Sequence, residues 1–245
     1  MKIFKFFITV ILLILFVLLI LYFLKDKPES TQETSVDLET DELINFTQGI
    51  DVSEYQGDID WSEVKESGVE FAIIRLGYRG YGTEGNFQKD KNFDKNMAGA
   101  IEAGVDVGVY LFSQAINSQE AMEEADYIID NISNYYVEYP LFIDVEYIQG
   151  EDARANNLTS EQRTDIVRTF CKRIEQAGFY PGVYSSGEWF TEGMDITKLS
   201  DYFLWLQDYT GEYSGLIECN MLQYTDSGNV NGIDGNVDLN KFFDN

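Results

Sequence analysis

The chain has 245 residues and carries 43 Asp+Glu against 17 Lys+Arg, for a formal net charge of −26. This balance argues against nucleic-acid binding, which needs a surplus of cations facing phosphate. The chain has no histidine, and its two cysteines do not form a CxxC motif, which excludes a Ser-His-Asp triad, a His-ligated metal and a structural zinc site. No metal or other cofactor is expected, and carboxylates remain the main candidates for acid–base chemistry.

The N-terminal segment is strongly apolar. From Phe6 to Leu24 it offers 19 residues, which at ~1.5 Å per residue give roughly the 30 Å needed to cross a bilayer. The stretch ends in bulky side chains without a small-residue cleavage pattern, which favours an uncleaved anchor over a cleaved signal peptide. Residues 1–24 are therefore predicted to be a cytoplasmic stub and one transmembrane helix. The expected location is the cell membrane, single-pass, with the catalytic domain extracellular.

Two regions of different composition follow the apolar segment. Residues 25–46 are polar, acidic and poor in aromatic side chains, so they are predicted to be a flexible linker. The first 46 residues hold 4 Lys+Arg and 7 Asp+Glu, so most of the negative charge belongs to residues 47–245. That stretch has a length typical of a single folded domain.

Strand and helix patterns alternate through this predicted domain. Short apolar, often β-branched runs predict eight strands, at residues 49–53, 69–77, 105–113, 140–146, 181–186, 202–207, 219–224 and 235–239. Helical spacing of apolar residues predicts helices within 60–68, 93–101, 121–132 and 166–174, the last ending at Gly178.

The fold class expected from this pattern is α/β. The earlier strands are continuous apolar runs, which is typical of a parallel sheet covered by helices. Alternating elements allow an open sheet or a closed barrel, and eight strands favour the barrel. Because the last links are short and Gly-rich, we expect an irregular (β/α) TIM-like barrel with few helices in its final third.

Four acids fall at predicted strand ends, where the chemistry of such barrels collects. They are Asp51, Asp144, Glu146 and Asp238. The first and last strands of a closed barrel are neighbours, so Asp51 and Asp238 are expected to be close. Asp144 and Glu146 are two residues apart on one strand and so share a face. One such acid could be structural, but four together suggest the paired carboxylates of glycoside hydrolysis.

The motifs that contain these acids occur in a recognisable order over roughly residues 48–243. They read GIDVSEYQGDIDW, FAIIRLGYRG, GVYLFSQA, PLFIDVE, GVYSS, LWL and VDLN. The set resembles glycoside hydrolase family 25, the lysozyme-like N-acetylmuramidases. The resemblance implies hydrolysis of the β-1,4 bond between N-acetylmuramic acid and N-acetylglucosamine in peptidoglycan. Peptidoglycan glycan strands are then the expected partner, together with the membrane through the N-terminal helix, and the catalytic domain is expected to be monomeric.

The resemblance also suggests roles for the acids. Glu146 matches the proposed general acid, and Asp144 matches the group that orients the substrate's N-acetyl group or stabilises the oxocarbenium-like state. Asp51 and Asp238 match the other two acids of the cluster. Whether a carboxylate or the substrate's acetamido group is the nucleophile stays open. Gln207 departs from the WLA-x-Y pattern often found in relatives, which puts subsite detail in doubt but not the acids.

Aromatic side chains near strand ends could stack on sugars or pack in the core, and the sequence leaves both open. The four in strands are Tyr110, Tyr184, Trp205 and Tyr224. Tyr78 and Tyr81 belong to a Gly-rich loop at 77–85, expected to be a flexible wall of the cleft.

Three further residues stand out, and two other functions remain open. Arg75 sits in an apolar strand and is expected to pair with an acid. Cys171 and Cys219 are expected to be free thiols, although export would permit a disulfide.

The alternatives to a muramidase are a non-catalytic wall-binding or scaffold protein and a hydrolase of another N-acetylhexosamine polymer such as chitin.

Overall fold

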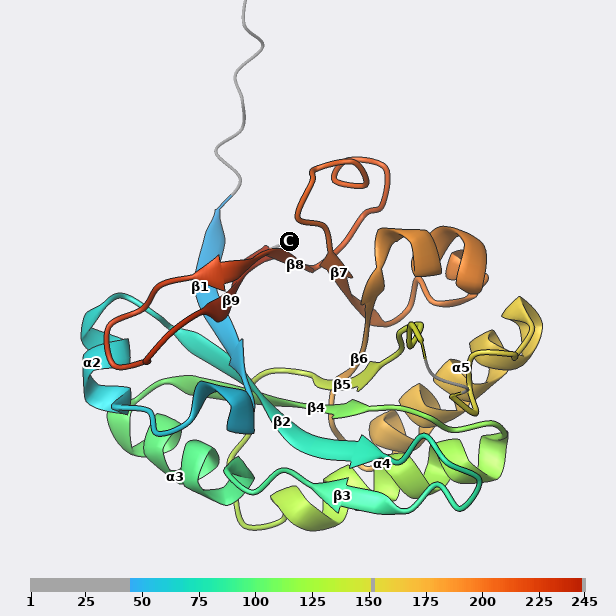
Figure 1. Cartoon of the computed structure of the whole chain (residues 1–245), viewed down its shortest axis with the longest axis horizontal. Coiled ribbons are helices and arrows are strands. Elements are labelled where there is room, and N and C mark those ends of the chain that lie inside the picture. Colours follow the sequence, from blue (N-terminus) through green and yellow to red (C-terminus); the bar gives the residue numbers. More distant parts are fainter. Residues whose placement is uncertain (1–44, 151–152, 244–245) are drawn as a thin grey trace, which may run out of the picture. The chain divides into compact units, whose positions relative to one another are not determined.

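A nine-stranded sheet organises the part of the chain that the computed structural model describes, residues 45–150 and 153–243. The strands are β1 (Phe46–Val52), β2 (Phe71–Arg79), β3 (Phe87–Lys89), β4 (Asp106–Phe112), β5 (Leu141–Asp144), β6 (Pro181–Ser186), β7 (Phe203–Gln207), β8 (Met221–Gly228) and β9 (Val237–Phe243). Their order is β1-β9-β8-β7-β6-β5-β4-β2-β3, and β1 also pairs with β2. Eight strands therefore close the expected barrel, and β3 lies outside it on β2 (Figure 1).

The last strand runs against its neighbours. β9 is antiparallel to both β1 and β8, whereas each of the other barrel pairings is parallel. The placement of Asp238 at the end of its strand was therefore wrong, because Asp238 is the second residue of β9. The reversal brings the start of β9 to the barrel mouth where the parallel strands end. Asp238 consequently lies directly opposite Asp51 in the register of β1 and β9.

The predicted Gly-rich loop is largely a hairpin. β2 extends to Arg79, and β3 pairs with it antiparallel, with Gly77 opposite Lys89. The Gly80 N–H donates to the Asn86 carbonyl at 2.9 Å, which closes the turn. The sequence missed β3 because three residues are too few to show a period-two pattern.

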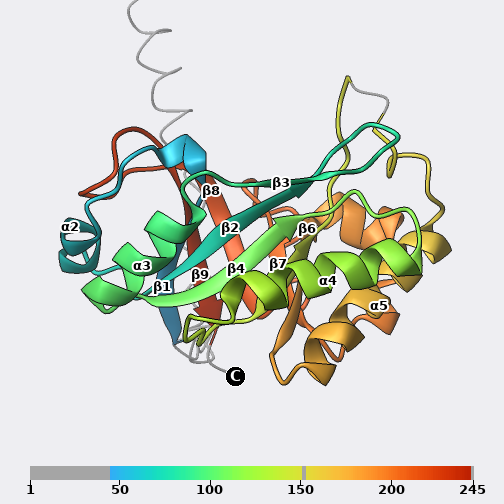
Figure 2. The same ribbon diagram turned by 90° about the horizontal axis from the view of Figure 1, so that it is seen from below.

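The helices cover one side of the barrel. They are α2 (Trp61–Glu66), α3 (Phe93–Ala103), α4 (Ser118–Ile132) and α5 (Ser160–Gln176). In Figures 1 and 2, α3, α4 and α5 lie along the outside of β2, β4, β5 and β6. After β6 there are only short turns of π- and 3₁₀-helix at Trp189–Gly193 and Ile196–Lys198. The expected loss of helices in the final third is confirmed.

Local chemistry explains where the long helices begin and end. Asn117 caps α4 by accepting from the Glu120 N–H, and Thr159 and Gln162 form a capping box at the start of α5. After α5, Gly178 has φ +88°, a conformation that other residues rarely adopt, so it terminates the helix as predicted.

The core has two layers because successive side chains of a strand point to opposite faces. Outward-facing aliphatic residues of the strands pack under the helices. The barrel interior is filled mainly by large side chains, namely Phe71, Ile73, Phe142, Tyr184, Trp205 and Met221. A Cβ at Gly182 would lie 2.3 Å from the Phe142 ring, so that position must stay small for the interior to close.

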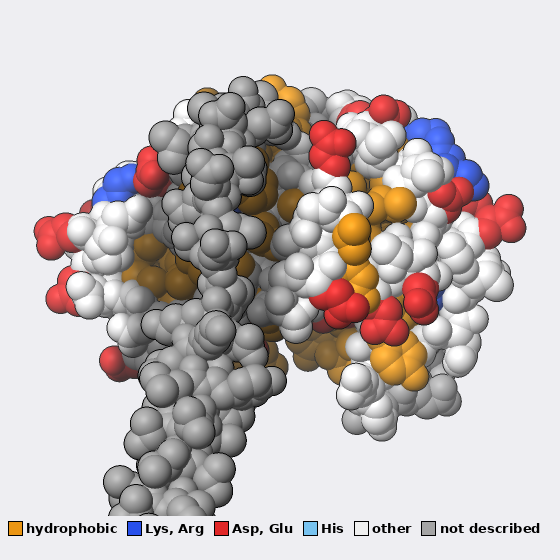
Figure 3. All heavy atoms as spheres, turned by 90° about the horizontal axis from the view of Figure 1, so that it is seen from above, with side chains coloured by type: hydrophobic (Ala, Val, Ile, Leu, Met, Phe, Trp, Pro, Cys, Tyr) orange, Lys and Arg blue, Asp and Glu red, His pale blue; other side chains and the backbone are white. Residues whose placement is uncertain are grey.

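Residues Ile44–Asn245 form one compact unit. Within residues 45–150 and 153–243, no helix is both long and apolar enough to span a bilayer. The predicted anchor at Phe6–Leu24 and nearly all of the predicted linker lie outside those ranges. Cys171 and Cys219 are both free thiols, as expected. Acidic side chains are scattered over the described surface seen from above, with basic side chains near its edges (Figure 3).

Candidate active site

The four acids gather at one mouth of the barrel. Asp51 and Asp238 face each other across β1 and β9, and Asp144 is the last residue of β5. Glu146 lies two residues beyond Asp144, after the strand has ended. Asp144 is influenced by the charges of both Glu146 and Asp51, and Glu146 by that of Asp238. The structure therefore brings all four predicted acids into one electrostatically coupled group.

Asp144 and Glu146 form a pair of buried, hydrogen-bonded acids. Burial, reinforced by the neighbouring Glu146, raises the pKa of Asp144 well above its usual range. Burial also raises the pKa of Glu146. Asp144 is only 3% exposed, whereas Glu146 lines an open cavity of about 470 Å³. A proton held by this pair can therefore reach a bound ligand most directly from Glu146.

Asp51 and Asp238 form a second pair with a different environment. Burial raises the pKa of Asp51, and its Oδ2 accepts hydrogen bonds of 2.8 Å from Gln223 Nε2 and from Asn240 Nδ2. Burial and the charge of Asp51 raise the pKa of Asp238 to about 8. The sequence did not single out Gln223 or Asn240. They lie on β8 and β9, whose sequences MLQYTDSG and VDLNKFF hold other polar residues as well, so neither amide stands out in the sequence.

Arg75 faces this acidic mouth from β2. Its Nη2 lies 2.8 Å from Asp90 Oδ2, so the predicted pairing with an acid is confirmed. The guanidinium also lies over the Tyr55 ring, 4.9 Å from the centroid. Its positive charge opposes the rise in the pKa of Asp144. Arg75 therefore partly compensates the negative charge of the cluster.

Two of the predicted sugar-stacking residues lie inside the barrel. Trp205 is 1% exposed and Tyr184 is 6% exposed. Their rings pack together edge-to-face with centroids 4.5 Å apart. Neither offers an open ring face to a sugar in this structure. The core alternative that the sequence left open describes their position.

Tyr224 lies on the wrong face of the sheet for this site. Its hydroxyl accepts a 2.9 Å hydrogen bond from Gln48 Nε2, and the Lys241 ammonium lies 5.0 Å from its ring centroid. Its neighbour Gln223 points to the opposite face and reaches Asp51. The structure thus separates Tyr224 from the acids, because adjacent strand residues alternate between inside and outside.

The remaining predicted aromatic residues lie around the acids. Tyr110 is half-buried, and burial and the Asp51 charge raise its pKa well above the usual range. The Tyr78 and Tyr81 rings are neighbours, with centroids 6.1 Å apart. Tyr81 is 41% exposed, and Glu146 contributes to the raised pKa of its hydroxyl, an effect dominated by burial. The hairpin thus places Tyr81 near the candidate acid.

A stack of three side chains, which the sequence analysis did not predict, borders the cavity at Glu146. The buried Arg163 guanidinium lies 3.9 Å from the Trp189 ring centroid. The Trp189 ring in turn stacks with Tyr147, with centroids 6.0 Å apart and planes at 27°. Tyr147 is 52% exposed and directly follows Glu146. These residues come from separate loops and a helix, so no sequence spacing links them.

Asp208 anchors a loop beside the cavity. Although burial opposes ionisation, hydrogen bonds from Ser214, Thr210 and Tyr213 lower the pKa of Asp208 to about 2. The loop carries Tyr209, whose hydroxyl donates to Gln223 Oε1 at 2.7 Å. The anchored loop therefore connects the rim of the site to the residues that contact Asp51.

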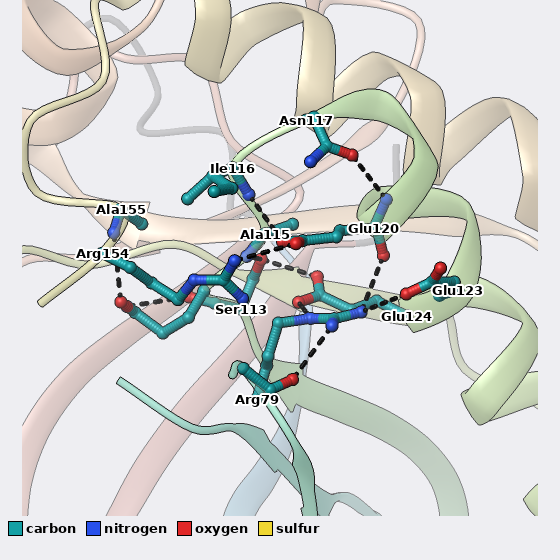
Figure 4. A network of polar contacts seen from close by, with 12 residues as sticks. Arg79, Ser113, Ala115, Ile116, Asn117, Glu120, Glu123, Glu124, Arg154 and Ala155 are labelled. Carbon is teal, nitrogen blue, oxygen red and sulfur yellow. Dashed lines mark hydrogen bonds and ion pairs between the residues drawn. The ribbon is translucent and has the colours of Figure 1, made fainter. Parts of the chain in front are cut away.

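A buried polar network supports the hairpin that carries Tyr81 (Figure 4). Arg79 Nε donates to Glu124 Oε1 at 2.8 Å, and Ser113 Oγ donates to Glu124 Oε2 at 2.6 Å. Arg154 Nη2 donates to Glu120 Oε1 at 2.8 Å. The network ties the β2–β3 hairpin to α4 and to the end of β4. It holds one wall of the site without contacting the acids.

Other features of the described surface do not compete with this site. A larger groove of about 1010 Å³ lies between α2, α3 and residues 229–234, but none of the four acids lines it. Within the described ranges, no group of three or more Cys, Asp or Glu side chains is arranged to hold a metal ion. What the barrel mouth can do chemically is therefore move protons and stabilise positive charge with carboxylates.

Comparisons with known proteins identify the family of this chain. The model of glycosyl hydrolases family 25 matches residues 50–233. The autolytic lysozyme of Clostridium acetobutylicum is 31% identical over 197 residues, which cover 80% of this chain and 55% of the relative. Lysozyme M1 of Streptomyces globisporus is 30% identical over 205 residues, which cover 80% of this chain and 67% of that protein.

Solved structures show the same fold. The modular autolysin LytC of Streptococcus pneumoniae superposes with a TM-score of 0.71 at 27% identity, over 81% of this chain and 47% of LytC. The bacterial lysozyme of Streptomyces coelicolor superposes with a TM-score of 0.68 at 28% identity, over 81% of this chain and 92% of that structure. The chain spans about half the length of the clostridial lysozyme and of LytC.

Proposed function

The chain belongs to glycosyl hydrolase family 25, a family of glycosidases, and we propose that it hydrolyses peptidoglycan at the β-1,4 bond between N-acetylmuramic acid and N-acetylglucosamine. The observation that carries the proposal is the group of four coupled carboxyl groups at the barrel mouth, one of which, Glu146, opens into a cavity. The names of the relatives, autolytic lysozyme and lysozyme M1, support this substrate class.

In the proposed mechanism the two pairs of acids have different tasks. Glu146 donates its proton to the glycosidic oxygen as the bond breaks. The ionised carboxylates that remain stabilise the positive charge that develops on the sugar. Burial raises the pKa of the donor Glu146, although its hydrogen bond with Asp144 acts in the opposite direction. The buried Asp144 carboxyl group is suited to accept a hydrogen bond from the substrate's N-acetyl N–H. The aromatic barrel interior lowers the local dielectric constant, which strengthens the interaction between the carboxylates and the developing positive charge.

We further propose that the domain acts outside the cell while attached to the membrane through Phe6–Leu24. The domain is strongly acidic, and bacterial walls are themselves anionic, so electrostatic attraction cannot concentrate it on its substrate. A tether through residues 25–46 would supply that proximity instead. Restricting the enzyme to wall near its anchor would also limit the cutting to a local region.

Digestion of purified peptidoglycan by the full-length chain tests the function. New reducing ends of N-acetylmuramic acid, identified by mass spectrometry after borohydride reduction, are the expected product. N-acetylglucosamine reducing ends would contradict the proposed bond. Wall binding without any new reducing end would identify the chain as a binding or scaffold protein. Faster release of sugars from chitin than from peptidoglycan would show that the substrate is another N-acetylhexosamine polymer.

The pH dependence of cleavage is expected to be a bell whose two limbs are set by carboxyl groups. Burial raises the pKa of Asp144 and Glu146, so the proton donor survives above the usual carboxylic range and is lost as pH rises through its raised pKa. On the acidic side, the rate falls as the carboxylate that must carry a negative charge becomes protonated. Asp51 is a candidate for that carboxylate, and burial raises its pKa, so this limb should also lie above the usual carboxylic range. Rates of wall lysis measured in buffers of constant ionic strength check this. Activity that still increased well above pH 8, the region where Asp238 ionises, would contradict a carboxylic acid donor.

A further inference from the structure

Two buried amides converge on one oxygen of Asp51. Gln223 Nε2 and Asn240 Nδ2 each donate to Asp51 Oδ2 at 2.8 Å. Gln223 is 3% exposed and Asn240 is fully buried. Water therefore has little access to these groups, and their orientation depends on the protein groups at their far ends.

The far ends determine which amide atom faces Asp51. Trp205 Nε1 donates to Asn240 Oδ1 at 2.8 Å. An indole N–H cannot accept a hydrogen bond, so the Asn240 oxygen must face Trp205 and its NH₂ group must face Asp51. Trp205 thus orients Asn240, which accounts for a buried tryptophan at this position.

Gln223 is oriented in the same sense by two phenols. The Tyr184 and Tyr209 hydroxyls donate to Gln223 Oε1 at 2.9 Å and 2.7 Å. With its oxygen engaged twice, Gln223 presents its NH₂ group to Asp51. The same carboxylate oxygen therefore receives two N–H donors, and donors stabilise the ionised form of a carboxyl group.

Asp238 lacks this support. It faces Asp51 across β1 and β9, and among the described residues no amide donates to its carboxyl group. When Asp51 is charged, ionising Asp238 would place two negative charges side by side. The geometry therefore distinguishes two acids that the sequence could only group together.

We propose that Gln223 and Asn240 are positioning residues that fix the negative charge of this pair on Asp51 and leave the remaining proton on Asp238. The inference deepens the proposed function, on which its catalytic meaning rests. Above the acidic limb of the pH profile, Asp51 is the anion that faces the developing sugar cation, and Asp238 is a neutral donor able to hydrogen-bond a substrate oxygen. Both states exist in the free protein, so the assignment can be tested without substrate.

Other charges at the barrel mouth act on both acids of the pair. The titratable groups facing it are Asp144, Glu146, Asp226, Tyr110, Tyr184 and Tyr209. The acids in this set repel any negative charge, and Arg75, the cation near Tyr110 and Asp144, partly offsets them. None of them donates an N–H to Asp51, so the amides remain the feature that separates Asp51 from Asp238.

Carboxyl ¹³C NMR titration of the full chain in detergent, labelled at Asp Cγ, tests the assignment. Spectra of Asp51→Asn and Asp238→Asn assign the two resonances. The wild type is expected to show Asp51 ionising first and Asp238 ionising near pH 8. In Asn240→Leu, the first ionisation should shift upward by about one to two pH units, the range for loss of a hydrogen bond to a charged group. Asp238 should then carry a larger share of the first ionisation.

Two further variants keep the test decisive if Asn240→Leu folds poorly. Trp205→Phe keeps an aromatic ring but frees the Asn240 amide to turn, so a smaller shift in the same direction is expected. Tyr224→Phe removes a hydroxyl from the outer face of the same strand as Gln223 and should leave both titrations unchanged. Thermal unfolding confirms which variants are folded.

Each outcome bears on the proposal. Ionisation of Asp238 before Asp51 in the wild type would overturn it, as would an unchanged order and midpoint in a folded Asn240→Leu or Trp205→Phe protein. Since these measurements use no substrate, their failure is distinct from failure of the proposed function. The chain could show the expected titration order and yet release no N-acetylmuramic acid reducing ends. That result would contradict the proposed function but would still support the charge assignment.

Discussion

Replacing Glu146 by Gln is expected to slow peptidoglycan cleavage by at least about 10²–10⁴-fold, the usual contribution of a general acid. Gln has nearly the same shape but carries no acidic proton, so the barrel and its cavity should persist. Burial raises the pKa of Glu146, which keeps the wild-type group protonated where an exposed Glu would be charged. Rates of reducing-end release from purified peptidoglycan, measured at the pH optimum, give the comparison.

Glu188→Gln is the matched control for that experiment. Glu188 lines the same cavity as Glu146 but belongs to a different loop and lies outside the coupled group of acids. The same chemical change there should alter the rate only slightly. Circular dichroism and sedimentation with insoluble peptidoglycan check folding and binding. Near-normal turnover by a correctly folded Glu146→Gln protein would exclude Glu146 as the proton donor.

At pH 8, above the pKa of about 7 to which burial raises Glu124, replacing Arg79 by Met is expected to destabilise the domain by about 3–5 kcal/mol, the usual cost of removing one partner of a buried ion pair. Arg79 and Glu124 lie 2.8 Å apart, and their side chains are 5% and 0% exposed. Met fills part of the volume but leaves the Glu124 carboxylate buried without a cation. For a domain of this size the melting temperature should fall by roughly 6–20 °C.

The loss should also depend on pH. Burial raises the pKa of Glu124 to about 7 even with Arg79 present. A buried carboxyl group with a raised pKa keeps its proton in the folded state at low pH. The free-energy cost of an unpaired negative charge at Glu124 is therefore absent at low pH and appears as pH rises through that pKa. The Arg79→Met protein should therefore lose more stability at pH 8 than at pH 5, as measured by thermal denaturation.

Lys95→Met provides the comparison for this second experiment. Lys95 pairs with Asp58 at the surface, where both side chains are largely solvated. Exposed pairs contribute little to stability, so the melting temperature should barely change. Equal losses in the Arg79 and Lys95 variants would show that the buried network does not support the hairpin.

The four acids illustrate how far local sequence carries the prediction. Asp144 is the last residue of the apolar strand β5, and Asp51 is the next-to-last residue of β1. A carboxyl group at such a place is visible in the sequence because it interrupts a short apolar run. The eight barrel strands and the closure of the barrel followed from the hydrophobic patterns, although the three-residue β3 was missed. The scarcity of late helices followed from the short, Gly-rich links between the last strands. These features depend on near neighbours in the chain, whose chemistry the sequence displays directly.

The direction of a strand and the face of the sheet to which its side chains point were harder to predict. Asp238 was expected at the end of a parallel strand, but β9 is antiparallel, and the strand's own residues contain no sign of its direction. Tyr224 was grouped with the site, yet it points away from Asp51. Strand direction and inward facing are set by how distant segments pack, and a short strand has too few residues to specify either.

The sequence by itself determined the barrel class, the approximate strands, the acidic character of the domain and the identity of the four acids. Each of these follows from amino-acid composition or from local patterns of apolar and polar residues. Only the tertiary structure decided what each acid experiences. Asp51 receives amides from β8 and β9, whose side chains are 172 and 189 residues away in the chain. Trp205 and Tyr184, for which the sequence left sugar stacking and core packing both open, donate hydrogen bonds to those amides. Charge in a buried site depends on partners brought together by folding, and no local pattern encodes that convergence.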